Sequence, residues 1–345
     1  MSPICQLDHL TTGYRQKNGT RIVSSQLNAS LRRGQMTCLL GANGTGKSTL
    51  IRTICGFLKP IEGQIILDGQ NVTALSAREM SKLVSVVLTD RVDIPNATVR
   101  ELVELGRSPY TGFMGTLSTD DREKAALSMK QTGIWHKHFQ PVAQLSDGER
   151  QKALIAKALA QDTPLIVLDE PTAFLDLPAR VEIMHLLRHL CMQEQKCILM
   201  TTHDLDLAMQ MADKLWLLQP DQPLLSGSPE DLMLQNAFQP MFAKSGIEFD
   251  PRTGLFRIAH PHHGQLAVKG HGFGYVMLRR ALSRRGIHTV GKTDNDQTWV
   301  EILGLDSPWF ELFANGHRIV KTASAETVVD KAVGLANVYT GPRPD

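Results

Sequence analysis

The sequence has few cysteines, and none is arranged for metal binding or redox chemistry. Five cysteines occur among 345 residues, and no two form a Cys-x-x-Cys pair. Two of them, Cys38 and Cys197, lie in apolar runs that favour a small hydrophobic side chain. We therefore expect reduced, structural thiols, as in a cytoplasmic protein.

Long apolar runs and a signal segment are also lacking. No apolar stretch approaches the ~20 residues that a helix needs to span a bilayer. The first residues do not have the basic, apolar and small-residue regions of a secretory signal. We expect any membrane association to depend on a partner protein. The formal net charge of +2 neither favours nor excludes nucleic acid or an anionic surface.

A glycine-rich stretch carries the strongest chemical signal. Within residues 41–49, the stretch from Gly41 to Ser48 matches G-x-x-x-x-G-K-[ST] in full, and the apolar residues 36–40 predict a buried strand before it. Such a loop turns backbone N–H groups toward an anion at the start of the next helix. The pattern predicts a polyphosphate site in which Lys47 reaches the β- and γ-phosphates and Ser48 binds Mg²⁺. The predicted nucleotide-binding residues here are Gly41, Asn43, Gly44, Thr45, Gly46, Lys47, Ser48 and Thr49.

Two later apolar runs end in polar residues. Residues 165–168 predict a buried strand followed by Asp169 and Glu170, and residues 197–200 predict another that leads to His203. Buried parallel strands end at the ligand-binding edge of a sheet. We expect Asp169 to hold Mg²⁺ through a water, and Glu170 to orient or deprotonate the water that attacks the γ-phosphate.

Local patterns place two other candidates. Ser146, with Glu149 three residues later, predicts a helix start with a capping box. Alternating segments around Asn18-Gly19 predict an antiparallel hairpin, with Tyr14 near the end of its first strand. Taken alone, Tyr14 fits a half-buried strand residue better than a ring that stacks on a base.

Taken in their order along the chain, the motifs resemble those of an ABC-transporter ATP-binding subunit over about residues 4–258. The resemblance implies an α/β P-loop NTPase with a RecA-like core, an antiparallel β subdomain and a helical insertion at about residues 97–160. It also implies ATP hydrolysis with Mg²⁺, in which Glu170, His203 and Lys47 are catalytic. The matching segments are Walker A (41–49), the signature (145–149), Walker B (165–170), the D-loop (173–176) and the switch histidine, His203.

The family resemblance further implies a head-to-tail homodimer that encloses two ATP molecules. Ser146 and Gly148 of one subunit would touch the γ-phosphate held by the other, and Asp176 belongs to the same site. Tyr14 matches the aromatic residue that stacks on adenine. The chain departs from the family at Thr89, where a metal-contacting Gln is usual; the shorter hydroxyl would reach Mg²⁺ only through a water.

Residues 98–110 resemble a stretch found in importers of ferric siderophores, haem and cobalamin. This implies a polytopic membrane permease, an extracytoplasmic substrate-binding protein and a peripheral location on the cytoplasmic face of the inner membrane, with no nucleic-acid partner. We expect an iron–siderophore chelate as cargo, and haem or cobalamin as the alternatives. A soluble non-transport ABC ATPase and a nucleotide-regulated binding module also remain open.

The length predicts a second domain after the ABC region. We expect a linker at residues 259–264 and a small α/β domain at 265–345, acting as a regulatory or dimer-stabilising module. His260, His262 and His263 in the linker favour a solvated segment over a metal site. The glycine cluster at 270–274 favours a tight turn over an anion site.

Overall fold

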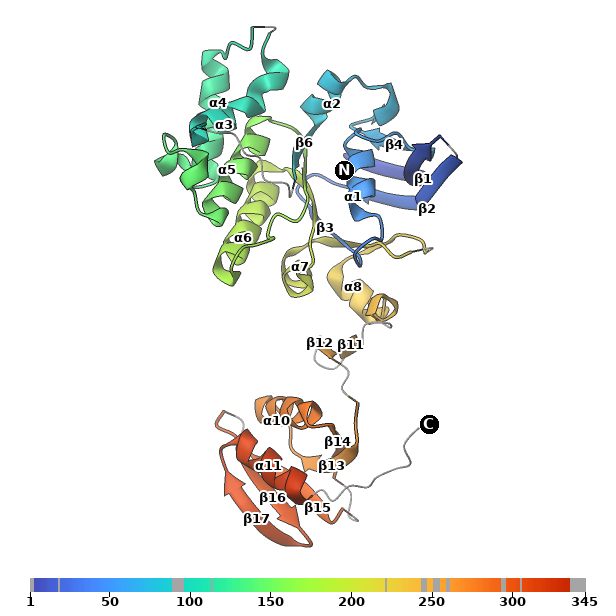
Figure 1. Ribbon diagram of the computed structural model, residues 1–345, viewed down its shortest axis with the longest axis vertical. Helices are drawn as coiled ribbons and strands as arrows, with labels where there is room; N and C mark the ends of the chain where they lie inside the picture. The colour runs from blue at the N-terminus through green and yellow to red at the C-terminus, as the bar shows by residue number, and fades with distance from the viewer. Residues whose placement is uncertain are drawn as a thin grey trace. The chain divides into compact units, whose positions relative to one another are not determined.

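The computed structural model describes residues 3–17, 19–88, 96–112, 114–220, 222–242, 247–250, 255–258, 261–292, 296–304 and 306–335. These residues belong to two compact units, 1–241 and 242–345, which are treated separately below (Figure 1). Within the described ranges, every helix is too short or too polar to serve as a transmembrane span.

The strands and helices follow the order of the chain. The strands are β1 Cys5–Gln16, β2 Gly19–Leu31, β3 Met36–Leu40, β4 Glu62–Leu67, β5 Gln70–Asn71, β6 Val84–Val87, β7 Leu165–Leu168, β8 Cys197–Thr201, β9 Lys214–Leu217, β10 Leu225–Gly227, β11 Ile247–Asp250, β12 Leu255–Ile258, β13 Gly264–Lys269, β14 Ile287–Gly291, β15 Thr298–Leu303, β16 Trp309–Ala314 and β17 His317–Thr322. The α-helices are α1 Lys47–Ile54, α2 Ala77–Leu83, α3 Val99–Glu104, α4 Thr119–Gln131, α5 Asp147–Ala160, α6 Leu177–Glu194, α7 Leu205–Met211, α8 Pro229–Leu234, α9 Gln239–Phe242, α10 Phe273–Arg284 and α11 Ala325–Leu335, and the 3₁₀ helices are η1 Val72–Ala74, η2 Leu105–Tyr110, η3 Trp135–Lys137 and η4 Val142–Gln144.

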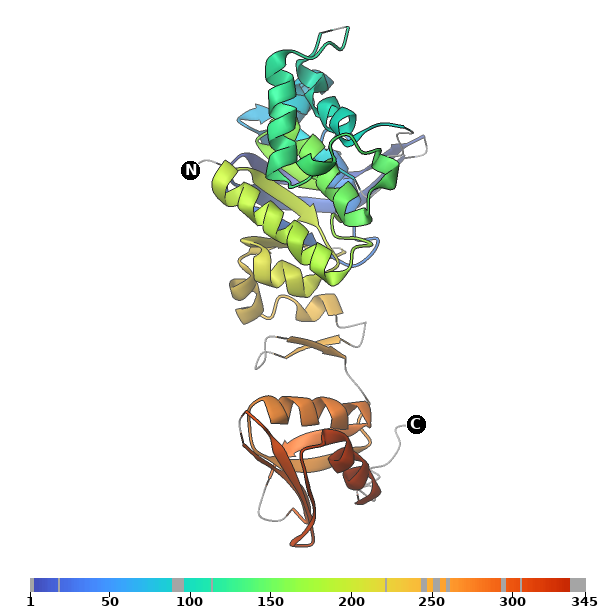
Figure 2. The same ribbon diagram turned by 90° about the vertical axis from the view of Figure 1, so that its left-hand side faces the viewer.

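A six-stranded sheet forms the centre of the first unit, in the order β10-β9-β3-β8-β7-β6. All its neighbouring strands pair in parallel except β10, which is antiparallel to β9. Its strands β3, β7 and β8 are buried throughout, as their nearly continuous apolar runs predict. Helices α1 and α6 lie on opposite sides of this sheet (Figure 1 and Figure 2).

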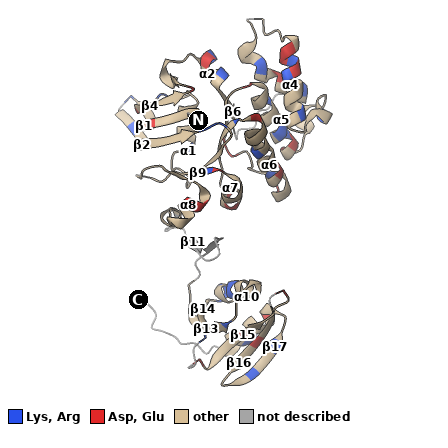
Figure 3. Cartoon of the chain, turned by 180° about the vertical axis from the view of Figure 1, so that it is seen from behind, with Lys and Arg blue, Asp and Glu red and all other residues tan. Residues whose placement is uncertain are grey.

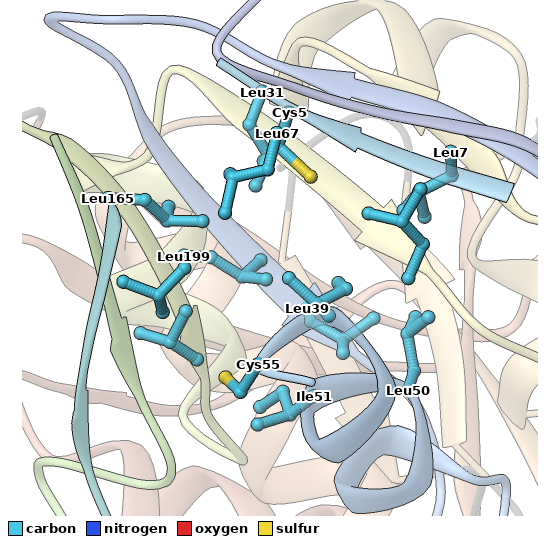
Figure 4. Packing of buried hydrophobic residues seen from close by; sticks show 14 of the residues in the cluster. Cys5, Leu7, Leu31, Leu39, Leu50, Ile51, Cys55, Leu67, Leu165 and Leu199 are labelled. Carbon is cyan, nitrogen blue, oxygen red and sulfur yellow. The ribbon is translucent and has the colours of Figure 1, made fainter. Parts of the chain in front are cut away.

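A second, antiparallel sheet has the order β2-β1-β4-β5. The predicted hairpin is confirmed, with Gln16 of β1 opposite Gly19 of β2. Figure 4 shows how the core joins both sheets through α1: Leu50 and Ile51 of this helix face Leu39 of β3, while Leu67 and its neighbours approach from the antiparallel sheet. This packing holds the start of α1 in place beneath the glycine-rich loop.

The helical insertion has its own core. Apolar residues of α3, α4 and α5 pack together, including Val103, Met129 and Ala153, which are at most 1% exposed. The three helices begin at Ser or Thr caps with complete capping boxes, and the box at Ser146 is one that the sequence predicts. Helix α4 carries both acidic and basic residues along its length (Figure 3).

The second unit contains a five-stranded mixed sheet in the order β14-β13-β15-β16-β17. Residues of α10 and α11, among them Leu278 and Val328, share one core with Val300 and Leu312 of the sheet. Five strands and two helices, β13–β17 with α10 and α11, thus lie within the described part of residues 264–335. The hairpin of β11 and β12, with Ile247 opposite Ile258, was not predicted from the sequence and lies in this unit. The predicted boundaries at 258 and 264 stay predictions.

Candidate functional site

Three neighbouring strands deliver the candidate residues to one edge of the parallel sheet. The strands β3, β8 and β7 are adjacent and parallel, so their carboxyl ends meet. Residues 41–46 follow β3, Asp169 and Glu170 follow β7, and His203 follows β8. This is the edge at which open α/β sheets bind ligands. The grouping of the three motifs predicted from the sequence is therefore a consequence of strand order.

The glycine-rich loop has a backbone that side chains disfavour. Gly44 and Gly46 have φ values of +81° and +100°. A Cβ atom at Gly46 would stand 2.5 Å from Cγ1 of Val23, so the second glycine is required by space as well as by conformation. The hydroxyl of Thr45 donates to the carbonyl of Ala42 at 2.9 Å and closes the turn. The shape of the loop is therefore determined by its own glycines and by this hydrogen bond, immediately before helix α1.

Lys47 is folded back onto this loop. Its Nζ donates to the carbonyl oxygens of Gly41 at 2.7 Å and Ala42 at 3.1 Å, and the residue is 7% exposed. Burial lowers the pKa of Lys47, while the nearby carboxylates of Glu170 and Asp169 act in the opposite direction. The ammonium group thus lies within electrostatic reach of both acids predicted to act with it.

Glu170 and His203 are in direct contact. Nε2 of His203 lies 2.9 Å from Oε1 of Glu170 across two strands, and both side chains are partly accessible to solvent. The backbone of Glu170 has a φ of +49°, a left-handed conformation that is uncommon for a residue with a side chain. Such outliers gather at functional sites, where the surrounding structure holds them. The geometry brings together the predicted base, Glu170, and the predicted switch histidine, His203.

Thr201, which the sequence did not single out, connects the two acids. It accepts a hydrogen bond from the backbone N–H of Glu170 at 2.8 Å and donates to Oδ1 of Asp169 at 2.7 Å. The one sequence feature that could have pointed to Thr201 is its hydroxyl at the end of an apolar run, like the two carboxylates at the end of residues 165–168. Sequence alone does not give the register of β7 against β8, so this contact could not be assigned.

Tyr14 lies beside the first turn of helix α1. Its hydroxyl is 3.1 Å from Oγ1 of Thr49, and it stands in β1 opposite Arg21 of β2. The half-buried strand position expected from local sequence is therefore observed. The same contact puts the tyrosine close to the predicted phosphate site, and its proposed stacking on adenine stays a prediction.

Ser146, Gly148 and Asp176 lie at the starts of two helices in contact. Ser146 caps α5 and is exposed, and Asp176 caps α6 by accepting from the N–H of Ala179 at 3.0 Å. A Cβ atom at Gly148 would lie 3.5 Å from Cβ of Ala179, so the two helix starts adjoin. These predicted residues thus form a second candidate surface, which contains no residue of the glycine-rich loop.

Thr89 and His260 lie outside the described residues. Of the other linker histidines, His262 packs edge-on against His288 with ring centroids 5.0 Å apart, and the N–H of His263 donates to Gly286 at 2.7 Å. The described ranges contain no group of three or more His, Cys, Asp or Glu side chains placed to hold a metal ion. All five cysteines are buried with free thiols, and burial raises the pKa of Cys38 to about 12.

Comparison with known proteins identifies the family. The family model for the ABC transporter domain matches residues 24–173. An ABC transporter ATP-binding protein of Methanocaldococcus jannaschii is 33% identical over 290 residues, which are 82% of this chain and 98% of that protein. The iron(3+)-hydroxamate import ATP-binding protein of Bacillus subtilis is 34% identical over 248 residues, covering 71% of this chain and 90% of its own length.

Solved structures agree with these relatives. A dimeric ATP-binding cassette in a post-hydrolysis state, bound to ADP and Pi, is 27% identical with a TM-score of 0.57, covering 65% of this chain and 98% of its own. The cbiO1 subunit of the ABC transporter complex cbiONQ from Clostridium perfringens is also 27% identical, with a TM-score of 0.61 and coverages of 74% and 98%. The chain therefore belongs to the ABC transporter family and is one of its ATP-binding, ATP-hydrolysing subunits.

Proposed function

We propose that this subunit hydrolyses ATP with Mg²⁺ in a head-to-tail homodimer and powers import of an iron–siderophore chelate through a membrane permease. The observation that carries the catalytic part is the 2.9 Å contact between Glu170 and His203, at the sheet edge shared with Lys47. A carboxylate that can accept a proton from water and a buried ammonium at the end of a glycine-rich loop are groups that phosphoryl transfer to water uses, and the imidazole of His203 orients the carboxylate.

The residues at this edge fit a magnesium ion. Ser48 offers a hydroxyl immediately after Lys47, and Asp169 offers a carboxylate that interacts electrostatically with Lys47. Oxygen atoms of this kind are the ligands that Mg²⁺ prefers. When bound, Mg²⁺ would neutralise charge on the β- and γ-phosphate oxygens. Thr89 stays a predicted contributor through a water.

The chain's own groups account for the chemistry. Lys47 would exchange its two carbonyl partners for phosphate oxygens, which are stronger acceptors because they are charged. Glu170 accepts the proton of the attacking water as the bond from water to the γ-phosphorus forms and the bond to the ADP oxygen breaks. His203 holds the Glu170 carboxylate in position for this transfer.

The second candidate surface supports a composite site. Ser146 and Asp176 are exposed at the adjoining starts of α5 and α6, and the positive end of the 14-residue helix α5 favours an anion. In a head-to-tail dimer, this surface of one copy would close over the phosphates that Lys47 of the other copy holds. A dimeric cassette among the solved relatives supports the homodimer.

The cargo is inferred from relatives and from residues 98–110. The named relatives include import subunits for achromobactin in Dickeya dadantii and for cobalamin in Halobacterium salinarum, at 38% and 36% identity. Arg107, within residues 98–110, stabilises the helical insertion. It is only 2% exposed and donates to Asp121 at 2.9 Å and to the carbonyl of Ala160 at 2.8 Å. Arg107 thus connects η2 to α4 and to the end of α5. We propose that the helical insertion docks on the permease at the cytoplasmic face of the inner membrane.

The test is cargo uptake by the reconstituted transporter. The chain would be purified with its permease, placed in vesicles with the extracytoplasmic binding protein, and supplied with ferric siderophore, haem or cobalamin. We expect ATP-dependent uptake of the ferric chelate, lost in Lys47→Ala. Uptake of haem or cobalamin alone would show that the cargo is not a ferric siderophore. ATP hydrolysis by a chain that binds no permease would favour a non-transport ATPase.

A further inference from the structure

A single buried hydroxyl joins the two acidic residues of the site. Thr201 is 0% exposed and lies at the end of β8. The pairing of Leu168 with Met200 brings the residues that follow each of them, Asp169 and Thr201, side by side. The strand register therefore places Thr201 beside the two acids that follow β7.

The direction of its hydrogen bonds is determined by the partners. A backbone N–H can only donate, so the N–H of Glu170 gives its proton to Oγ1 of Thr201 at 2.8 Å. The one hydroxyl proton of Thr201 is then free to donate to Oδ1 of Asp169 at 2.7 Å. The hydroxyl thus orients one acid through its side chain and the other through its backbone.

The hydrogen bond from the Glu170 N–H to Thr201 matters because the Glu170 backbone has a left-handed conformation. Its φ of +49° is uncommon for a residue with a Cβ atom and persists only where neighbouring groups hold it. The bond from its N–H to Thr201 is such a restraint. The same residue presents its carboxylate to Nε2 of His203 at 2.9 Å. A change in the Glu170 backbone would therefore move the carboxylate away from this partner.

We propose that Thr201 is a positioning residue that couples the metal-binding acid to the catalytic acid. This inference rests on the proposed roles of Asp169 and Glu170. Without the hydroxyl, Asp169 loses a donor and the N–H of Glu170 loses its acceptor, so both the metal ligand and the base are misplaced together. A residue that only fills the core at this position would not affect metal binding.

Three variants separate hydrogen bonding from packing. Thr201→Val keeps the shape and removes the hydroxyl, and Thr201→Ser keeps the hydroxyl and removes the methyl. The matched control is Thr163→Val, because Thr163 is 1% exposed, precedes the opposite end of β7 and also donates a hydrogen bond, to Ser85 at 2.9 Å. If Thr201→Val does not fold, as judged by circular dichroism, Thr201→Ala replaces it in the comparison.

The readouts are kcat for ATP hydrolysis and the affinity for Mn²⁺ in the presence of ADP, measured by electron paramagnetic resonance. We expect Thr201→Val to lower kcat and Mn²⁺ affinity by about 10–100-fold each, as loss of a partner of a metal ligand typically does. Thr201→Ser should stay within about threefold of wild type, since the hydrogen-bonding group is retained.

Equal kcat and Mn²⁺ affinity in Thr201→Val and Thr163→Val would overturn the inference. A loss that Thr201→Ser shares in full would also overturn it, because packing would then explain the effect. Absence of ATP hydrolysis in the wild-type protein would instead contradict the proposed function, so the two failures are distinguishable.

Discussion

At the scale of single residues, charged groups in the interior are held by specific partners. Asp121 in the first turn of α4 accepts from the hydroxyl and N–H of Ser118 at 2.6 and 3.0 Å, and from Arg107 at 2.9 Å. The Ser118 bonds, followed by Arg107, lower the pKa of Asp121 to about 2. The ionised carboxylate therefore stabilises the folded protein.

The depressed pKa predicts a pH-dependent effect of Asp121→Asn. A carboxyl with a lower pKa in the folded state contributes its stability above the unfolded pKa of about 3.9, and loses it as pH falls toward the folded value. We expect the variant to lose about 2 kcal/mol of unfolding free energy at pH 7. The difference should shrink between about pH 4 and pH 2.

Urea titrations over this pH range measure the effect. The neighbouring Asp120→Asn is the control, because the Asp120 side chain is 70% exposed and pairs only loosely with Lys124 at 3.6 Å. Equal losses in both variants at pH 7 would show that Asp121 does not have the stabilising role assigned to it.

Individual contacts between distant residues were the part that sequence could not predict. Lys47, Glu170 and His203 were identified because each lies in a local motif with a known spacing. The hydroxyl of Thr201 acts on residues 31 and 32 positions away, across a strand register that local patterns do not determine. Arg107, likewise, is a charged residue whose burial depends on partners in two other helices.

At the scale of elements, local pattern predicted helix starts and strands well. The capping box at Ser146 and the hairpin that joins β1 to β2 are present where the sequence places them. The apolar runs around β3, β7 and β8 are buried strands. How closely two elements approach was not predictable, because it depends on tertiary packing.

The contact between η2 and α5 supplies a prediction at this scale. A Cβ atom at Gly106 would stand 2.2 Å from the carbonyl oxygen of Lys157, so only glycine allows this approach. Gly106→Ala should force the helices apart and lower the unfolding free energy by about 1–3 kcal/mol, as overpacking typically does.

Gly112→Ala is the matched control, since nothing lies within 4 Å of a Cβ atom at that position. Thermal and denaturant unfolding of both variants measure the difference. A Gly106→Ala protein as stable as the control would mean that the close approach is not needed for the fold.

At the scale of the whole molecule, the second unit has an independent core. Its sheet and its helices α10 and α11 pack through their own apolar residues. We expect removal of residues 260–345 to leave the first unit folded, and to change dimerisation, ATPase rate or uptake if this unit is regulatory or stabilises the dimer. Sedimentation, phosphate release and uptake assays would test this, and the hypothesis fails if all three are unchanged.

We propose that Glu170 is the base of an ATPase site that a second copy of the chain completes. The most direct measurement is analytical ultracentrifugation of Glu170→Gln with ATP and Mg²⁺, combined with an assay of phosphate release. We expect an ATP-containing dimer with no detectable turnover, because the amide keeps the shape of the carboxylate and cannot accept the proton of water. Turnover equal to wild type, or a protein that binds ATP only as a monomer, would contradict it.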